Sequence, residues 1–568
     1  MKSPPEVHES IKKMHPLRRR KFWALLPIIL LILAASPLRE NYFEMSKQLE
    51  IMTAMFRELN IYYVDEIQPG KLMESGINSM VKSLDPYTVY YPESRVEDLR
   101  FITTGEYGGI GASIQFMNGQ HTFIDVLPEF PAYRAGLKIG DVLISVNGTI
   151  LGGVDEALIP EMLQGASGSE VNITYKRYGD SPPVDVVLTR EKIKLKAVPF
   201  RSVVQDSTGY IMLSAFTRGS SFEVRQALKY LQDSIGINQL VLDLRGNGGG
   251  LLQESISIVN LFVAKGQEVV STRGKNDDWT KSYTTRGEPI APDLPLAILI
   301  DSYSASASEI VAGTLQDLDR AVICGQESFG KGLVQQTKQL AYGTRLKVTV
   351  AKYYTASGRC IQRLDYGGER SQDGSALAIS DSVIQVFYTQ NGRPVVDGKG
   401  IQPDIKVETP NMSYVLEGLL ANGLLFDFAN QWSSKRDSIA PPYEFPLSEE
   451  NWTEFVAFVD QKEESVYESN SAMIWEELMS AAALEQYLED ENEAFDVFSS
   501  VFAANTERDL NRFRSEIATA LKEEIILRFY PQDAVINWMI PEDAVLQKSI
   551  DLLSSGEANQ ILLGPTNP

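Results

Sequence analysis

Histidine is scarce in this 568-residue chain, and the scarcity restricts the catalytic chemistry open to it. The three histidines are His8 and His15, in a basic tail, and His121, in a glycine-rich, β-prone region. A serine nucleophile usually gives its proton to a histidine. None of the three is placed to serve a serine near residue 300. A serine hydrolase built there would need a lysine as its base.

Cysteine is almost absent. Cys324 and Cys360 are the only two, so there is no dense disulfide framework and no paired metal-ligand spacing. One disulfide between them is conceivable, but we expect two buried free thiols. With so few histidines and cysteines, we expect no catalytic metal and no other cofactor.

Positive charge is also in deficit. The chain carries 53 Lys and Arg against 75 Asp and Glu, a net charge of −22, which argues against nucleic acid as a partner. Its 43% apolar and 23% charged residues are ordinary for a globular protein. Its length predicts three or four domains rather than one core.

The N-terminal residues reverse the sign of the charge. Residues 1–21 hold seven basic and two acidic side chains, and fourteen uncharged, mostly apolar residues follow from Phe22 to Ala35. This run is short for a span of ~20 residues but typical of a secretion signal. Pro37 hinders cleavage after the small residues before it. We therefore expect 22–36 to be an uncleaved signal anchor in the cytoplasmic (inner) membrane, rather than a cleaved signal or a buried core helix.

That anchor would leave the basic tail 1–21 in the cytoplasm and the remaining chain in the periplasm or an equivalent extracytoplasmic space. The next region, 40–103, reads as helical. Apolar residues recur at steps of three and four within 45–56 and 71–81. Ser83-Leu-Asp-Pro86 ends the second of these helices.

Residues 104–192 are predicted to form a β domain. Glycines cluster at 107–112, and short β-prone runs follow. The stretch from Ala132 to Gly148 predicts a short helix, a turn and a strand that ends in an Asn-Gly hairpin signal.

This series resembles a PDZ domain in its circularly permuted bacterial form. In that family a glycine-rich loop presents backbone amides to the carboxylate of a peptide's C-terminus. The loop falls on Gly109, Ile110 and Gly111. The alternative is that these glycines only form a tight turn.

Residues 193–409 are predicted to be α/β. Apolar strands at 209–213, 239–243 and 296–300 alternate with helices, which indicates a sheet covered by helices. The extension 410–568 is helical and acidic and carries no chemical motif. Helices are expected in it at 463–477, 482–498 and 507–529. It is either an appendage or an interaction domain, for a homo-oligomer or an adaptor.

The main chemical signal is Ser304-Ala-Ser-Ala-Ser-Glu309, directly after an apolar strand. Lys331 lies 25 residues beyond the middle serine, Ser306, between two glycines and among apolar residues. A lysine can act as a base only when neutral, so its pKa must fall from ~10.4 through burial or nearby positive charge. Gln335 would face Lys331 and hold its amine if this stretch were helical.

Ser306 stands between a strand and a helix, where a helix N-terminus favours developing negative charge. The amide of Ala307 is one candidate oxyanion donor. The second is Gly248 or Gly249, in the glycine run of 244–250 that follows another strand. Each motif alone has a plainer interpretation: a serine helix cap, or a phosphate loop. The glycine run lacks the Gly-Lys-Ser/Thr ending of a P-loop.

Taken together, in their order along the chain, the PDZ-like, glycine, serine and lysine motifs resemble the carboxy-terminal processing, or tail-specific, proteases. Ser83–Pro86, Tyr354–Arg359 and Gly400–Asp404 match as well, and the resemblance covers about residues 45–408. It implies an α/β fold with a crotonase-like (ClpP/crotonase) protease core, an N-terminal helical region and an inserted PDZ-like β domain.

The resemblance also implies roles for individual residues. Ser306 becomes the nucleophile, Lys331 the general base and Gln335 its support. The implied substrates are exported proteins or peptides, bound through their C-termini and cut near apolar tails.

The sequence therefore predicts an exported serine endopeptidase with a Ser-Lys dyad. A non-catalytic PDZ adaptor is the alternative, although an adaptor has no need of the serine, lysine and glutamine. Acyl-CoA chemistry on a crotonase-like core is the second alternative, and both the peptide-binding module and the exported location argue against it.

Overall fold

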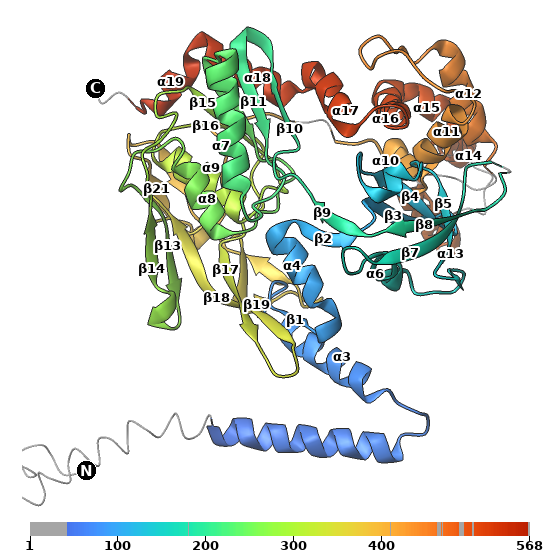
Figure 1. Cartoon of the computed structure of the whole chain (residues 1–568), viewed down its shortest axis with the longest axis horizontal. Coiled ribbons are helices and arrows are strands. Elements are labelled where there is room, and N and C mark those ends of the chain that lie inside the picture. Colours follow the sequence, from blue (N-terminus) through green and yellow to red (C-terminus); the bar gives the residue numbers. More distant parts are fainter. Residues whose placement is uncertain are drawn as a thin grey trace, which may run out of the picture. The chain divides into compact units, whose positions relative to one another are not determined.

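The structure is a computed structural model, and it describes residues 42–179, 181–408, 411–462, 467, 470–487, 493–502 and 505–565 (Figure 1). The predicted tail and signal anchor lie outside these residues, so the anchor stays a prediction. None of the described helices is both long and apolar enough to cross a membrane. The chain forms two compact units, residues 1–83 and 84–568, each of which is described by itself.

The described part of the first unit, residues 42–83, is mainly helical, as predicted. One helix covers residues 42–62 and the second is α3 (Pro69–Lys82), whose first turn contains Pro69, a residue well suited to that position. Ser83 caps α3 at the predicted break. Many apolar side chains of 42–62 are exposed, among them Met45 and Ile61.

The predicted helical region 40–103 is wrong in one respect. A strand, β1 (Val89–Tyr91), and a short 3-10 turn interrupt it before α4 (Val96–Thr104). Strand β1 pairs with β18 (Arg345–Thr355), more than 250 residues away in the sequence. Only that distant strand explains an extended segment in a stretch with helical periodicity.

The PDZ-like region is a β domain closed by two short helices. Its main sheet has the order β3-β4-β5-β7-β8, with β6 paired to β5, while β2 and β9 form a separate antiparallel pair. Asn147 and Gly148 both have positive φ, 50° and 79°, as the predicted hairpin turn requires. Its elements are β2 (Glu106–Gly109), β3 (Ala112–Met117), β4 (Gln120–Val126), α5 (Pro131–Arg134), β5 (Val142–Val146), β6 (Thr149–Ile150), α6 (Ile159–Leu163), β7 (Glu170–Lys176), β8 (Val184–Thr189) and β9 (Glu191–Lys194).

A six-stranded sheet forms the centre of the α/β region, in the order β10-β11-β12-β15-β16-β23. All neighbours pair parallel except β10 and β11. The predicted strands at 239–243 and 296–300 are confirmed. The strands are β10 (Phe200–Val203), β11 (Thr208–Met212), β12 (Gln239–Asp243), β15 (Leu296–Ile300), β16 (Val322–Gly325) and β23 (Ile405–Lys406).

The two faces of this sheet belong to two different cores, because side chains alternate along a strand. Leu240 and Leu242 share a core with helices α7 (Ser220–Lys229), α8 (Leu252–Val259) and α9 (Ala307–Asp317). Val241, between them, belongs to a second core that includes α18 (Ala544–Ser555). A strand buried on both faces carries apolar residues on both, as 240–242 and 296–300 do.

A second, antiparallel sheet lies beside the first in the fold. Its order is β1-β18-β13-β14, with β17 also paired to β18. Its other strands are β13 (Glu268–Gly274), β14 (Lys281–Thr284) and β17 (Leu333–Gln339). Two further antiparallel pairs are formed by β19 (Leu364–Arg370) with β20 (Ala376–Ala378) and by β21 (Val386–Tyr388) with β22 (Pro394–Val396).

The described part of the C-terminal extension is helical, but two of its three expected helices are interrupted. The other, expected at 463–477, lies partly outside the described residues, and 470–477 belong to α13. The helix expected at 482–498 is wrong, since one helix ends at Leu484 and the next begins at Glu493, and the helix expected at 507–529 is broken at Phe513. The helices are α10 (Tyr414–Ala421), α11 (Leu424–Ser433), α12 (Glu449–Asp460), α13 (Asn470–Leu484), α14 (Glu493–Phe502), α15 (Thr506–Arg512), α16 (Arg514–Ile526), α17 (Gln532–Met539), α18 and α19 (Glu557–Leu562).

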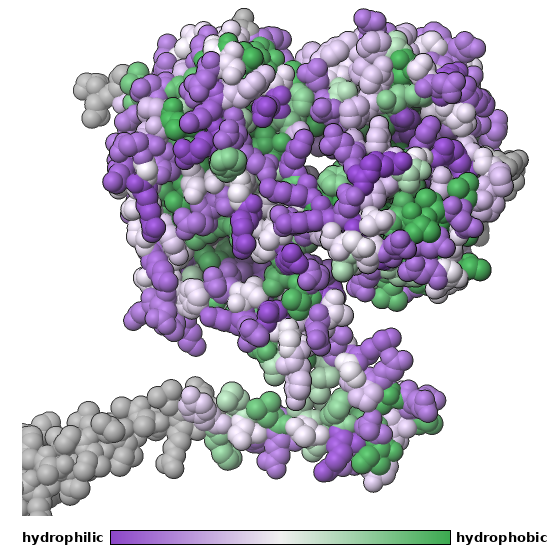
Figure 2. All heavy atoms as spheres, in the orientation of Figure 1, coloured by the Kyte–Doolittle hydropathy of each residue, from purple (hydrophilic) through white to green (hydrophobic). Residues whose placement is uncertain are grey.

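Most of these helices share their own core, in which Phe428 and Phe455 stack edge to face. The last of them, α18 and α19, instead share a core with the central sheet. The extension is therefore not a separate appendage at its C-terminal end. Figure 2 shows polar and charged side chains over most of the visible face, with apolar patches between them.

Candidate active site

Ser306 sits at the turn between β15 and α9 in a strained conformation. Its φ of 56° and ψ of −108° lie in a region that residues other than glycine rarely occupy. The preceding loop is held by the carboxylate of Asp301, which accepts hydrogen bonds from the amides of Tyr303 and Ser304. Strain of this kind persists where surrounding contacts enforce it, and it is concentrated at functional sites.

The glycine run after β12 lies directly against the serine loop. The amide of Ala305 donates to the carbonyl of Asn247 at 3.0 Å, and Ser308 Oγ donates to the same carbonyl at 2.8 Å. A β-carbon added to Gly249 would lie 2.8 Å from the β-carbon of Ser306. Only glycine permits this close approach, especially since Gly249 has a φ of +97°.

Glu309 joins the serine loop to the lysine loop. This fully buried carboxylate accepts hydrogen bonds from the amides of Ser306 (2.7 Å), Gly330 (2.7 Å) and Lys331 (2.9 Å), and from Ser328 Oγ (2.6 Å). Burial raises its pKa, and the four hydrogen bonds oppose that rise.

Tyr353, on β18, makes a second connection between the same two loops. Its buried hydroxyl donates to the carbonyl of Lys331 at 2.6 Å and lies 3.1 Å from the carbonyl of Ser306. Sequence reasoning assigned no role to Glu309 or to Tyr353. Glu309 could have been found from its position three residues after Ser306, which is the spacing of a helix capping box. No local sequence pattern marks Tyr353.

The side chain of Lys331 is placed where its amine can lose a proton near neutral pH. Burial, the main cause, and the nearby charge of Lys347 lower its pKa to about 8, against weaker opposing effects of Glu309 and Asp85. Its Nζ lies 4.0 Å from the centre of the Tyr87 ring, which Tyr366 contacts edge-on. An amine with this pKa is partly neutral at physiological pH.

Gln335 does not lie as the sequence argument assumed. It belongs to strand β17, next to a bulge between Val334 and Gln335, so a helical spacing from Lys331 does not apply. Its side-chain amide donates to Thr349 Oγ1 at 3.4 Å.

Backbone hydrogen bonds show which of the candidate oxyanion donors have an amide available for a ligand. Ala307 is the first residue of α9, where a backbone amide has no partner within the helix. The amide of Gly249 already donates to Asn247 Oδ1 at 2.9 Å. Gly248 is therefore the better placed of the two glycines to offer an amide to a ligand.

The glycine-rich turn of the PDZ-like domain lies between β2 and β3. Gly109 ends β2, and the buried Ile110 accepts a hydrogen bond from the amide of Ala132 through its carbonyl. Gly111 has a φ of +76°, and a β-carbon there would lie 2.3 Å from that of Phe130. The turn thus requires glycine for its own geometry, whatever it binds.

The described residues also include one histidine and two cysteines. His121 is buried on β4 and packs against Phe116, in the PDZ-like sheet. Cys324 is buried and Cys360 half-buried, and both are free thiols; burial is the main cause that raises the pKa of each. Among the described residues, no three His, Cys, Asp or Glu side chains are grouped to hold a metal ion.

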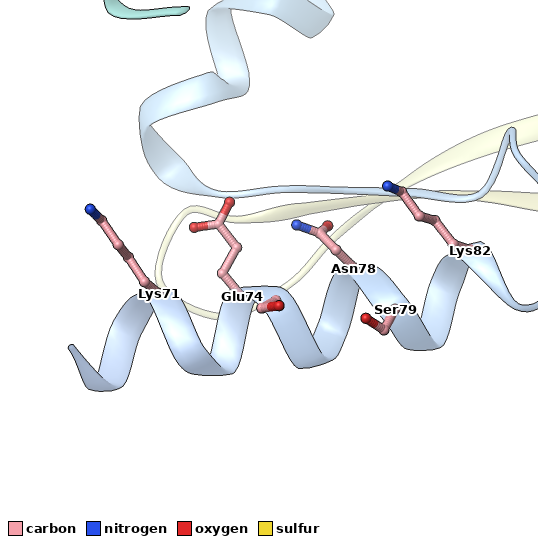
Figure 3. Close-up of a pocket in the computed structure, with 6 residues that line it drawn as sticks. Lys71, Glu74, Asn78, Ser79 and Lys82 are labelled. Carbon is pink, nitrogen blue, oxygen red and sulfur yellow. The ribbon is translucent and has the colours of Figure 1, made fainter. Parts of the chain in front are cut away.

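Two surface hollows lie apart from the serine and lysine loops. The hollow in Figure 3 is lined by one face of α3, including Lys71, Glu74 and Lys82, so no second element contributes to it. Another, of about 830 Å³, borders α4 and strand β2, beside Phe101 and Tyr107. Neither contains the serine and lysine loops.

Models of three known domain families match this chain. Peptidase family S41 matches residues 207–368, a PDZ domain matches 122–177, and the C-terminal helical domain of a probable PDZ-protease matches 415–553. The carboxy-terminal-processing protease of Bartonella bacilliformis is 37% identical over 338 residues, which are 59% of this chain and 77% of the relative.

This chain belongs to peptidase family S41. It is a serine peptidase of the carboxy-terminal-processing type, with a PDZ domain and a C-terminal helical domain. A probable CtpA-like serine protease of Staphylococcus aureus is 32% identical over 360 residues, 63% of this chain and 64% of the relative. The solved photosystem II D1 C-terminal processing protease is 27% identical, with a TM-score of 0.35, over 64% of this chain and 93% of its own.

Proposed function

We propose that the peptidase works with a catalytic dyad in which Ser306 is the nucleophile and Lys331 the general base. The observation that carries the proposal is the shared carboxylate of Glu309, which accepts the amides of both residues at 2.7 and 2.9 Å. The lowered pKa of Lys331, about 8, supports it, because a base must be neutral to accept a proton.

In the proposed reaction, Lys331 Nζ accepts the proton of Ser306 Oγ as this oxygen bonds to the carbonyl carbon of the substrate. The carbonyl oxygen becomes an oxyanion, which the amides of Ala307 and Gly248 stabilise. As the C–N bond breaks, the protonated lysine gives its proton to the leaving amine. A water molecule, deprotonated by the same lysine, then attacks the acyl-enzyme and releases the acid.

Substitutions at the dyad test this proposal with an unfolded protein that ends in an apolar tail. Ser306→Ala, Lys331→Ala and Lys331→Arg should all abolish cleavage, the last because arginine does not become neutral. Lys338→Met, at an exposed lysine on β17, is the control and should retain activity. An active Lys331→Arg enzyme would refute the lysine base.

Capture of substrate tails by the PDZ domain is the second part of the proposal. The C-terminal carboxylate would bind at the amides of Gly109, Ile110 and Gly111, and the tail would extend the sheet along β3. Gly111→Ala should raise KM for tailed substrates, because its β-carbon would meet Phe130 at 2.3 Å. Gly119→Ala, at a similar φ of +75° but with open space around it, is the matched control.

The chemistry of the substrate tail gives an independent check of this step. A charged last residue should slow cleavage of an otherwise identical substrate, since apolar tails are the proposed ligands. Equal kcat/KM for apolar and charged tails would refute tail capture by the PDZ domain but would not contradict the proposed dyad.

Export and a crotonase-like core complete the proposal. The basic residues 1–21 followed by the apolar run 22–36 support an inner-membrane anchor with the peptidase in the periplasm. The mostly parallel central sheet beside a second sheet supports the fold class. Protease accessibility of the peptidase in spheroplasts, with and without 22–36, tests the location, and a cytoplasmic peptidase in the full chain would contradict it.

A further inference from the structure

The C-terminal helix α18 forms part of the catalytic sheet's packing. Val545, Leu546 and Ile550 of this helix share a core with Val241 of β12 and Leu299 of β15. These two strands lead into the glycine run and the serine loop, respectively. The helix therefore covers the face of the sheet opposite α7, α8 and α9.

Polar contacts along α18 fix its position on the sheet. At its C-terminal end, Gln239 Nε2 donates to Ser554 Oγ at 2.9 Å. In its first turn, Gln205 Nε2 donates to Gln547 Oε1, also at 2.9 Å. The helix is thus bonded to the sheet region near both of its ends.

Asp543, the N-cap of α18, performs two tasks with one carboxylate. Its Oδ1 accepts the amides of Val545 and Leu546 at 3.1 and 3.0 Å, as an N-cap does. The same group pairs with Arg245 through two parallel bonds, Nη1 to Oδ1 at 3.1 Å and Nη2 to Oδ2 at 2.5 Å. Arginine and aspartate in this bidentate geometry hold each other in a defined orientation.

Arg245 is the first link between that pair and the oxyanion region. It follows β12 and immediately precedes Gly246. Its Nε and Nη2 also donate to Asp243, which is 1% exposed and accepts the hydroxyl of Tyr210 at 2.6 Å. The guanidinium is thus clamped between a carboxylate of the sheet and a carboxylate of the C-terminal helix.

Hydrogen bonds of the residues next to Arg245 connect it to the loop that contains Ser306. The carbonyl of Leu244 accepts Ser304 Oγ at 2.8 Å, and the amide of Gly246 donates to Asp301 at 3.1 Å. Gly249 then abuts Ser306. A shift of Arg245 would therefore move the amide of Gly248 that the proposed mechanism uses.

We propose that Asp543 is a positioning residue of the peptidase, which holds the oxyanion loop in place through Arg245. The C-terminal extension thereby supplies a contact that the active site needs, although it contains no catalytic group. This inference rests on the proposed function of Ser306 and of the Gly248 amide.

Asp543→Asn is the sharpest test, because asparagine caps a helix about as well as aspartate. It removes the negative charge of the carboxylate and replaces one of its oxygens with an NH2 group, which cannot accept a hydrogen bond from the Arg245 guanidinium. With a fluorescently labelled unfolded protein as substrate, kcat should fall by about tenfold or more, up to the ~10²–10³ that complete loss of one oxyanion donor costs. KM and the thermal midpoint should stay close to the wild-type values, and Asp543→Glu should restore part of kcat.

Two control variants separate positioning from stability. Asp551→Asn makes the same chemical change at an exposed site of α18, and Ser554→Ala removes a docking bond of that helix; both should keep the wild-type kcat. Arg245→Lys should lower kcat as Asp543→Asn does, and the double variant should be no worse than either single one.

Amide hydrogen exchange of residues 246–250 gives a readout that does not depend on cleavage. Exchange should be faster in Asp543→Asn and unchanged in Asp551→Asn. Wild-type kcat in Asp543→Asn, or a loss that follows the thermal midpoint in all variants with unchanged loop exchange, would overturn the inference. If the wild-type protein cleaved nothing, the proposed function would fail, and the exchange data would still decide whether Asp543 orders the loop.

Discussion

Lys331→Met should inactivate the peptidase and at the same time make the folded protein more stable. The pKa of this lysine falls from 10.5 to about 8, chiefly because the amine is buried. At pH 7 the neutral fraction is then about one in ten instead of about one in three thousand, a ~300-fold gain in competent base. The neutral fraction is larger because burial disfavours the charged form of the amine.

The cost to stability follows from the same shift. Each pKa unit corresponds to about 1.36 kcal/mol, so 2.5 units destabilise the folded state by about 3 kcal/mol below pH 8. Between pH 8 and 10.5 the unfolded chain binds the proton and the folded chain does not, so stability rises with pH until the penalty is gone. Methionine avoids the penalty but loses the contact with the Tyr87 ring, worth ~0.5–1 kcal/mol.

Urea unfolding at pH 7 and pH 10 measures this balance. Lys331→Met should be more stable than the wild type by about 2–3 kcal/mol at pH 7, with the difference largely lost by pH 10. Lys338→Met is the control, because Lys338 is exposed yet also contacts an aromatic ring, that of Trp279 at 4.8 Å. A destabilised Lys331→Met, or a gain that is the same at both pH values, would refute the reasoning. So would wild-type activity that stays flat from pH 6 to 10 instead of rising about tenfold above pH 7.

The remaining predictions concern the geometry around the dyad. Gly249→Ala should lower kcat by about 10²-fold or more, because its β-carbon would lie 2.8 Å from that of Ser306, the proposed nucleophile. Gly266→Ala, at a similar φ of +90° but with open space around it, should keep the wild-type kcat, and equal kcat values in the two variants would contradict the packing. Glu309→Gln should lower kcat by about 10²-fold without unfolding the protein, as judged by circular dichroism, because an amide cannot accept all four hydrogen bonds. Tyr87→Leu should shift the alkaline rise in activity about half a unit toward lower pH, since the ring favours the charged amine, whereas Tyr87→Phe should leave the profile unchanged; identical profiles would show that the ring has no influence.

Local patterns in the sequence predicted the elements that depend on local physics. Residues 240–242 and 296–300 are all apolar because both faces of the sheet are covered. The Asn147-Gly148 turn follows from the two residues' tolerance of positive φ. The same level of reasoning singled out Ser306 and Lys331, since a chain poor in histidine has few other bases.

Sequence reasoning was wrong where a distant partner overrides the local pattern. Gln335 lies on a strand because β18 pairs with it, not on a helix above Lys331. Strand β1 interrupts a helical region for the same reason. The helix expected at 482–498 is divided because apolar periodicity alone does not set where a helix ends.

The sequence alone indicated the strands, the turns and the two residues of the proposed dyad, because the signals for each of them lie within a few neighbouring positions. Only the tertiary structure decided how the loops of Ser306 and Lys331 are held together. Glu309 and Tyr353 connect the two loops, and Asp543 reaches Arg245 across 298 positions. Such contacts form only when the sheet brings the ends of different strands to one edge. Periodicity along the chain therefore cannot predict them.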